Sequence, residues 1–204
     1  MVRDLADRLR RLPNGIVWLL GAIPLALLVW DIFTGGLGID PVRDIENRLG
    51  RTALYFVIGS LCFTPALRLF RINLVKFRRP VGLVAFSYAA LHFATWIVLD
   101  MGFLWSQIVA DIVKRPYLIL GMIALTILTV MAVTSGNRVL RKLGPVRWRQ
   151  IHRMIYAAAP IAVLHWLISH KIWPVWGITM GTVVLLLLAL RVPVIQTNLR
   201  KLVS

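Results

Sequence analysis

The chain has 204 residues, 59% of them hydrophobic, and its mean hydropathy is +0.78. This composition excludes an ordinary soluble protein, which needs a polar surface around its core, and it indicates a membrane protein. The net charge of +16 comes from 24 Lys and Arg against 8 Asp and Glu, but no hydrophilic segment is long enough to fold a basic surface for nucleic acid.

Six apolar runs approach or reach the roughly 20 residues that a helix needs to cross a bilayer. In chain order they cover residues 16–33, 52–67, 81–99, 117–133, 151–169 and 172–190. The segments between them are too short to form a second domain. We therefore predict an all-α, polytopic membrane protein, a bundle of six transmembrane helices that forms a single domain over residues 1–204.

The basic residues are distributed unevenly over the connections between these runs. Eighteen Lys and Arg fall on the two chain ends, the second-to-third connection and the fourth-to-fifth connection, whereas the other connections hold six, balanced by six acidic residues. Basic residues are enriched in cytoplasmic connections. We therefore expect both termini in the cytoplasm, with the basic charges in contact with the headgroups of the lipid bilayer.

The connection over residues 35–50, expected on the outer side, contains a helix-start signal. Asp40 suits an N-cap, Pro41 suits the first helical position, and apolar residues follow at helical spacing. We expect a short amphipathic helix here. It either lies on the membrane surface or forms a docking surface for an outer partner.

No Asp, Glu, Lys or Arg lies deep within a predicted span, but two histidines do, His92 in the third span and His165 in the fifth. Ionisable residues at such a depth are costly and indicate function. Each lies 12 residues after the predicted inner end of its span, at Pro80 and Arg153, which is about 18 Å along a helix. Both spans run outward, so the two imidazoles are expected at one level.

Two neutral imidazoles at one level can hold a haem iron between them. An interhelical hydrogen bond would explain one buried histidine but explains a matched pair less well. Zinc usually takes four ligands, and no Cys or carboxylate is expected at this level. The single Cys62 excludes an internal disulfide and the C-x-x-C-H attachment of c-type haem, so any haem would be held without a covalent bond.

The other two histidines of this region lie at the ends of the predicted span. His152 precedes His165 by 13 residues, about 20 Å and about 140° away on a regular helix, so the two cannot share one haem. His152 either binds a second haem at the inner side or contacts phosphates among neighbouring arginines. His170 is expected to face solvent or headgroups, with a haem propionate contact as its functional alternative.

Three segments together resemble the MsrQ (YedZ) family of haem-binding membrane subunits. They are "SYAALHF" at residues 87–93, "TSGNRVLRKLGPVRWRQIHRMIY" at residues 134–156, and "LHW" at residues 164–166. That family belongs to the ferric reductase-like transmembrane domains, which include NADPH oxidases. The resemblance covers nearly the whole chain and matches His92, His152 and His165 to the family's haem-associated histidines.

The resemblance implies a subunit of the bacterial inner membrane that transfers electrons and is not itself the catalytic subunit. Such subunits take electrons from the quinone pool or a cytosolic flavin reductase. They pass them through haem b, with FMN also implied, to a periplasmic molybdopterin-dependent reductase that repairs methionine sulfoxide in proteins. No residue of this chain is thereby identified as catalytic or as an FMN ligand.

The sequence departs from other relatives in two ways. Relatives with two haems carry a second histidine on each ligand helix, but the matching residue before His92 is Arg79; we therefore expect one haem between His92 and His165 and leave a second at His152 open. Other relatives also carry a carboxy-terminal flavin and nicotinamide domain, which has no counterpart in the 14 residues after Leu190. We expect the electron donor to be a separate molecule.

The sequence is also compatible with two other functions. One is a stand-alone b-type cytochrome that reduces ferric iron or quinone, which differs from the first interpretation only in its partner. The other is a non-redox transporter or sensor. Transporters often carry broken helices in repeated halves and charges near the midplane, and the sequence shows neither feature.

Overall fold

A computed structural model describes residues 12–191 of the chain. Within this range every regular element is helical, and five helical segments are long and apolar enough to cross a membrane. A sixth helix, α9 (Val175–Ala189), is apolar but shorter. The protein is therefore an all-α, multi-pass membrane protein. The six-span count and the cytoplasmic termini stay predictions, and the chain ends lie outside the described residues.

Three helices coincide closely with the first, third and fourth predicted spans. They are α2 (Gly15–Thr34), α4 (Arg78–Thr95) and α6 (Pro116–Val133). A short 3₁₀ turn, η1 (Val75–Phe77), precedes α4, and a π-helical segment, η2 (Trp96–Asp100), continues it. Helix α4 with these two extensions is thus longer than the apolar run alone.

The second span differs from the expectation of a separate short helix in the outer connection. Helix α3 runs without interruption from Pro41 to Leu69, so the expected surface helix forms its first turns. Asp40 caps it as predicted, because its side chain accepts a hydrogen bond from the backbone N–H of Arg43 at 3.1 Å. The charged residues between the two segments suggested a boundary, but charge alone does not interrupt a helix.

The fifth predicted span, residues 151–169, corresponds to helix α8, and the candidate span of the structure extends further back to Asn137. Helix α7 (Asn137–His152) and helix α8 (Ile155–Ile168) are separated by a turn at Arg153 and Met154. His152 is therefore the last residue of α7, whereas His165 lies on α8. Helix α7 itself bends at Gly144, where φ is 75° and ψ is 160°.

Helix α5 (Trp105–Lys114) lies in the connection before the fourth span and is not among the predicted elements. Its apolar side chains recur at helical spacing. Ile108 is buried against the bundle, whereas Trp105, Val109 and Val113 are exposed. The helix is amphipathic and is too short to span a membrane.

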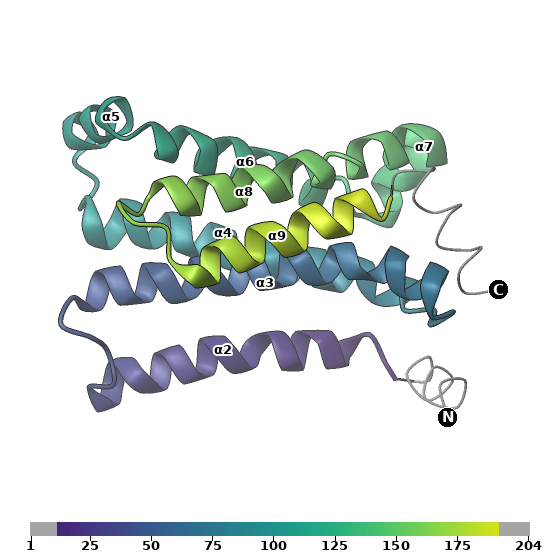
Figure 1. Cartoon of the computed structure of the whole chain (residues 1–204), viewed down its shortest axis with the longest axis horizontal. Helices are drawn as coiled ribbons and strands as arrows, with labels where there is room; N and C mark the ends of the chain where they lie inside the picture. Colours follow the sequence, from purple (N-terminus) through teal and green to yellow (C-terminus); the bar gives the residue numbers. More distant parts are fainter. Residues whose placement is uncertain (1–11, 192–204) are drawn as a thin grey trace.

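The long helices lie side by side, with α5 and α7 at opposite ends of the bundle (Figure 1). Helix α3 packs along α4, α6 packs along α8, and α9 contacts both α8 and α3. Five of these helices share the main apolar core, in which Leu61 and Ala159 have no exposed surface. Large apolar side chains also cover the outside; Phe33, for example, is 84% exposed, as expected where a helix faces lipid.

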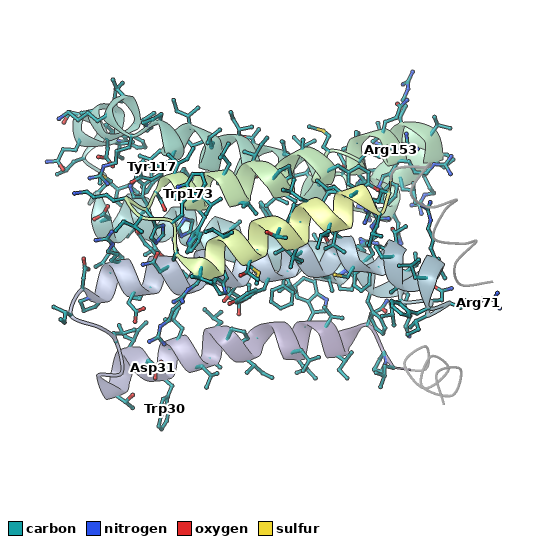
Figure 2. All side chains as sticks on the ribbon, in the orientation of Figure 1. Trp30, Asp31, Arg71, Tyr117, Arg153 and Trp173 are labelled. Carbon is teal, nitrogen blue, oxygen red and sulfur yellow. The ribbon has the colours of Figure 1, made fainter. Side chains whose placement is uncertain are left out.

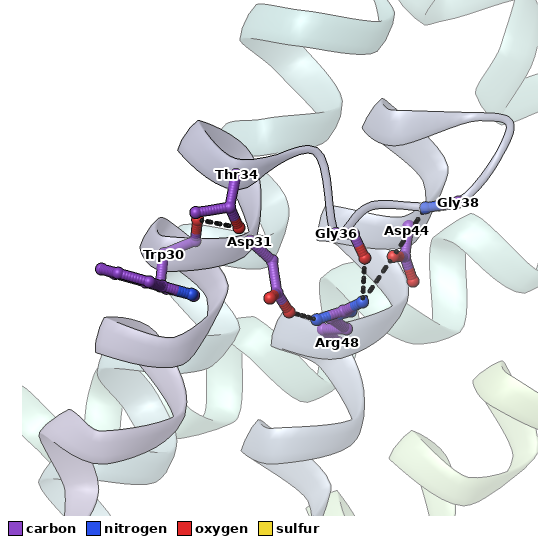
Figure 3. Close-up of polar contacts among 7 residues, drawn as sticks. All are labelled: Trp30, Asp31, Thr34, Gly36, Gly38, Asp44 and Arg48. Carbon is purple, nitrogen blue, oxygen red and sulfur yellow. Dashed lines mark hydrogen bonds and ion pairs between the residues drawn. The ribbon is translucent and has the colours of Figure 1, made fainter.

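Helix α2 is joined to the other helices by polar contacts at two points. Within the apolar region, the Tyr88 hydroxyl donates a hydrogen bond to the carbonyl oxygen of Gly21 at 2.5 Å. Near the end of α2, Arg48 of α3 pairs with Asp31 and lies 2.9 Å from a carboxylate oxygen of Asp44 (Figure 3). Arg48 also donates to the carbonyl oxygen of Gly36, so one guanidinium group connects α2, α3 and the loop between them.

Segments predicted to lie on the same side of the membrane share one end of the bundle. Asp31, Tyr117 and Trp173 lie at one end, and Arg71 and Arg153 lie at the other (Figure 2). Connections predicted to lie on opposite sides of the membrane therefore lie at opposite ends of the bundle. We refer to these as the outer and inner ends, after the predicted orientation.

Candidate functional site

His92 lies three residues before the end of α4 and faces helix α3. Its Nδ1 atom is 2.9 Å from the backbone carbonyl oxygen of Glu46. A carbonyl oxygen can only accept a hydrogen bond, so Nδ1 carries the proton and Nε2 carries the free lone pair. This is the form of histidine that coordinates a metal through Nε2.

His165 has the same arrangement on another pair of helices. It lies three residues before the end of α8, and its Nδ1 atom is 2.7 Å from the carbonyl oxygen of Tyr117 on α6. The same reasoning leaves the lone pair on its Nε2 atom. Both histidines are thus oriented by main-chain acceptors of a neighbouring helix.

The structure brings these two histidines together. Their ring centroids are 6.3 Å apart, and the ring planes make an angle of 72°. With a metal–nitrogen bond of about 2 Å on each side, two imidazoles that share one metal ion have centroids about 6 Å apart. The residues present therefore fit a pair of axial ligands to one iron.

The residues around the histidine pair limit which kind of metal centre could bind there. Among residues 12–191, no set of three or more His, Cys, Asp or Glu side chains could hold a metal ion. A porphyrin fits this donor set, because it supplies the remaining nitrogen ligands itself. Trp96, one turn after His92, has a buried Nε1 atom without a hydrogen-bond partner among the described residues, which suits a bound group with polar substituents.

Comparison with known proteins places the chain in a family. A family model described as a ferric reductase like transmembrane component matches residues 49–163. The chain is 41% identical over 191 residues to the protein-methionine-sulfoxide reductase heme-binding subunit MsrQ of Brucella anthropi, covering 92% of the chain and 86% of that relative. The subunit of the same name from Brucella ovis is 41% identical over 187 residues, covering 89% and 84%. The chain belongs to the MsrQ family.

Membership of the MsrQ family identifies the chain as a membrane electron-transfer subunit of a methionine-sulfoxide reductase system. The ferric reductase match includes His92 and His152 and ends two residues before His165. The resemblance described from sequence segments is therefore confirmed at the level of the family. The roles of the individual histidines rest on their geometry.

His152 occupies a different environment from the paired histidines of this MsrQ-family chain. Its Nδ1 atom is 3.0 Å from the carbonyl oxygen of Trp148 on its own helix, and its ring stacks on the Trp148 ring with centroids 3.9 Å apart. Within residues 12–191, no other histidine ring contacts it. The structure thus places His152 at the end of α7, apart from the pair.

His170 also makes local contacts in the structure. Its Nδ1 atom is 3.0 Å from both the Trp166 carbonyl oxygen and the Ser169 hydroxyl oxygen, and its ring lies against the Trp166 ring. These contacts hold the ring at the outer end of α8. The contact of His170 with headgroups or a haem propionate stays a prediction.

Sequence reasoning missed the residues that orient the two paired histidines in the MsrQ-family site. Glu46 and Tyr117 act through backbone carbonyl groups, which every residue has, so their side chains carry no signal. A glycine follows each of them by four residues, Gly50 and Gly121. Glycines inside helical segments indicate close approach of another group, and this signal was available in the sequence.

Proposed function

We propose that His92 and His165 are the axial ligands of one haem b, through which the protein passes electrons to a methionine-sulfoxide reductase subunit. The observation that carries this proposal is the 6.3 Å separation of the two rings, each with Nδ1 held by a backbone carbonyl. The names of the MsrQ relatives, which describe a heme-binding subunit, support the same assignment.

The residues of this chain have defined tasks in the proposed site. Bound haem supplies a one-electron carrier within the membrane. His92 and His165 present their Nε2 lone pairs, while the carbonyl groups of Glu46 and Tyr117 fix the tautomer and the ring orientation. Buried apolar side chains of the core exclude water from the space between the helices.

We extend the proposal to the partners implied by the family resemblance. The electron donor is the quinone pool or a cytosolic flavin reductase, with FMN as a further cofactor, and the acceptor is a periplasmic molybdopterin-containing reductase. The chain forms a single domain in the inner membrane with both termini in the cytoplasm. The concentration of Lys and Arg on the predicted inner connections supports this orientation.

Absorption spectra of the oxidised and reduced protein, purified in detergent, test the haem proposal. Wild-type protein should show a haem Soret band, and His92→Ala and His165→Ala should each lose most of the bound haem because one axial ligand is removed. Ser87→Ala is the matched control, because Ser87 bonds only to the backbone of its own helix. Wild-type protein without haem, or normal haem content in both histidine variants, would refute the proposal.

His152→Ala tests the number of haems in the same experiment. The proposal requires one haem at His92 and His165, and a second haem at His152 would be additional to it. The variant should keep the haem held by His92 and His165, because His152 is stacked on Trp148 and makes no contact with either ring. Loss of all haem in this variant would show that the one-haem assignment is wrong.

Reconstitution with an outer reductase subunit distinguishes the proposal from the stand-alone ferric or quinone reductase. Reduced protein should be oxidised by the subunit in the presence of methionine sulfoxide, and oxidation should stop when the subunit is omitted. Oxidation by ferric iron or quinone alone, at the same rate with and without the subunit, would favour the stand-alone reductase.

A further inference from the structure

Each paired histidine lies directly against a glycine of the neighbouring helix. A Cβ atom at Gly121 of α6 would lie 2.8 Å from Cε1 and 2.9 Å from Nδ1 of His165. A Cβ atom at Gly50 of α3 would lie 3.3 Å from the same two atoms of His92. The first contact is too short to exist without a shift of the ring, and the second requires a small adjustment.

The two glycines have the same relation to the carbonyl groups that hold the histidines. Gly50 follows Glu46 by four residues, and Gly121 follows Tyr117 by four residues. In an α-helix the carbonyl of residue i and the side chain of residue i+4 lie on the same face, one turn apart. A side chain at the glycine position would therefore occupy the space through which the imidazole reaches the carbonyl oxygen.

We propose that Gly50 and Gly121 are positioning residues for haem ligation, because their missing side chains let each axial histidine reach a backbone carbonyl of the adjacent helix. This inference rests on the proposed haem site at His92 and His165. It explains why one local arrangement, a carbonyl at i and a glycine at i+4, occurs on both sides of the histidine pair. The glycines lie against the imidazole rings that would ligate the iron.

The hydrogen bond between each histidine and its carbonyl group also affects the reduction potential of the haem, which a purely steric role of the glycines would not. A hydrogen bond from Nδ1–H to a carbonyl raises the basicity of the ligating Nε2 atom and favours the more positively charged ferric state. Displacing the ring from the carbonyl weakens this bond. The reduction potential of the haem should then become more positive, while the helices stay folded.

Four alanine variants of the full-length protein in detergent test the inference. Gly121→Ala and Gly50→Ala fill the contacts described above. Gly59→Ala in α3 and Gly82→Ala in α4 are matched controls, because a Cβ atom at either position meets nothing within 4 Å. Alanine forms helix better than glycine, so the controls should be at least as stable as the wild type.

We expect a graded result across the four variants. Gly121→Ala should weaken haem binding by about 10- to 100-fold, the usual range for loss of a group that orients a metal ligand, and should move the potential of the remaining haem in the positive direction. Gly50→Ala should change both quantities in the same direction but less. Haem titration measures affinity, redox titration measures the potential, and circular dichroism verifies helix content.

The experiment distinguishes failure of the inference about the glycines from failure of the proposed haem site. If all four variants keep the affinity and potential of the wild type, the inference is wrong while the haem site stands. If wild-type protein binds no haem, the proposed function itself fails. Should Gly121→Ala lose its helix content, Gly50→Ala decides the inference alone, because its contact requires only a small adjustment.

Discussion

At the scale of single residues, Tyr88 has one of the few polar groups that join helices within the apolar region. Its buried hydroxyl donates to the Gly21 carbonyl oxygen. We predict that Tyr88→Phe lowers the free energy of unfolding by about 1 kcal/mol, the usual net value of an intramolecular hydrogen bond. Thermal unfolding of the purified protein in detergent measures the change.

Tyr55→Phe is the matched control for this prediction. The Tyr55 hydroxyl accepts a hydrogen bond from Nε1 of Trp176 at 3.0 Å, but Tyr55 is exposed. Its loss should cost less than the loss of the buried bond, because solvent or headgroups can replace it. A larger loss of stability in Tyr55→Phe would contradict the prediction.

The histidine pair could be predicted from the sequence, whereas its main-chain partners could not. His92 and His165 stand out because ionisable side chains are rare within membrane spans. Counting residues from the predicted inner ends placed both at one level. The carbonyl groups of Glu46 and Tyr117 have no comparable signal, because only the packing of α3 on α4 and of α6 on α8 selects them.

At the scale of elements, the bend within α7 depends on Gly144. Its φ of 75° and ψ of 160° lie in a region that is essentially restricted to glycine. A Cβ atom there would meet nothing within 4 Å, so substitution acts through the backbone alone. We predict that Gly144→Ala destabilises α7 by about 1 to 3 kcal/mol.

Limited proteolysis checks this prediction, because α7 contains several Lys and Arg residues at which trypsin cleaves. Cleavage between residues 138 and 149 should accelerate in Gly144→Ala. The spectrum of the haem held by His92 and His165 should stay unchanged, because α7 does not contribute to that histidine pair. Gly136→Ala, at a position with ordinary backbone angles and open space, is the control; equal acceleration there would contradict the argument.

The sequence predicted the apolar helices better than their boundaries. Apolar runs of about 20 residues favour helices in a bilayer, because a helix satisfies all backbone groups within the segment. The turn at Arg153 and Met154 has no Gly or Pro to announce it, so the split between α7 and α8 was not predicted. The continuity of α3 was missed for the opposite reason, because its charged first turns resembled a separate surface helix.

At the scale of the whole molecule, the histidine pair lies in the outer half of the bundle. His165 is three residues before the end of α8, and His92 is eight residues before Asp100, where the continuation of α4 ends. Tyr117, which holds His165, is the second residue of α6. Figure 2 shows Tyr117 at the end that also contains Trp173. The packed core fills much of the remaining length toward α7.

With the proposed haem and the predicted orientation, we expect electron transfer to be sensitive to the membrane voltage. His92 follows Arg78, the first residue of α4, by 14 residues, so an electron from an inner donor crosses about two-thirds of the hydrocarbon thickness to reach it. Moving one charge across the full membrane is worth about 2.3 kcal/mol per 100 mV. With the inner side negative, the outward step should gain about 1.5 kcal/mol per 100 mV.

Proteoliposomes with an imposed potassium diffusion potential test this expectation. An inside-negative potential of 100 mV should shift the reduction of haem by an enclosed donor about tenfold toward the reduced state, and the opposite polarity should shift it back. A response of the same sign for both polarities would contradict it. Because His92 and His165 lie off the centre of the bundle, the membrane potential would favour the transfer of electrons toward the outer side.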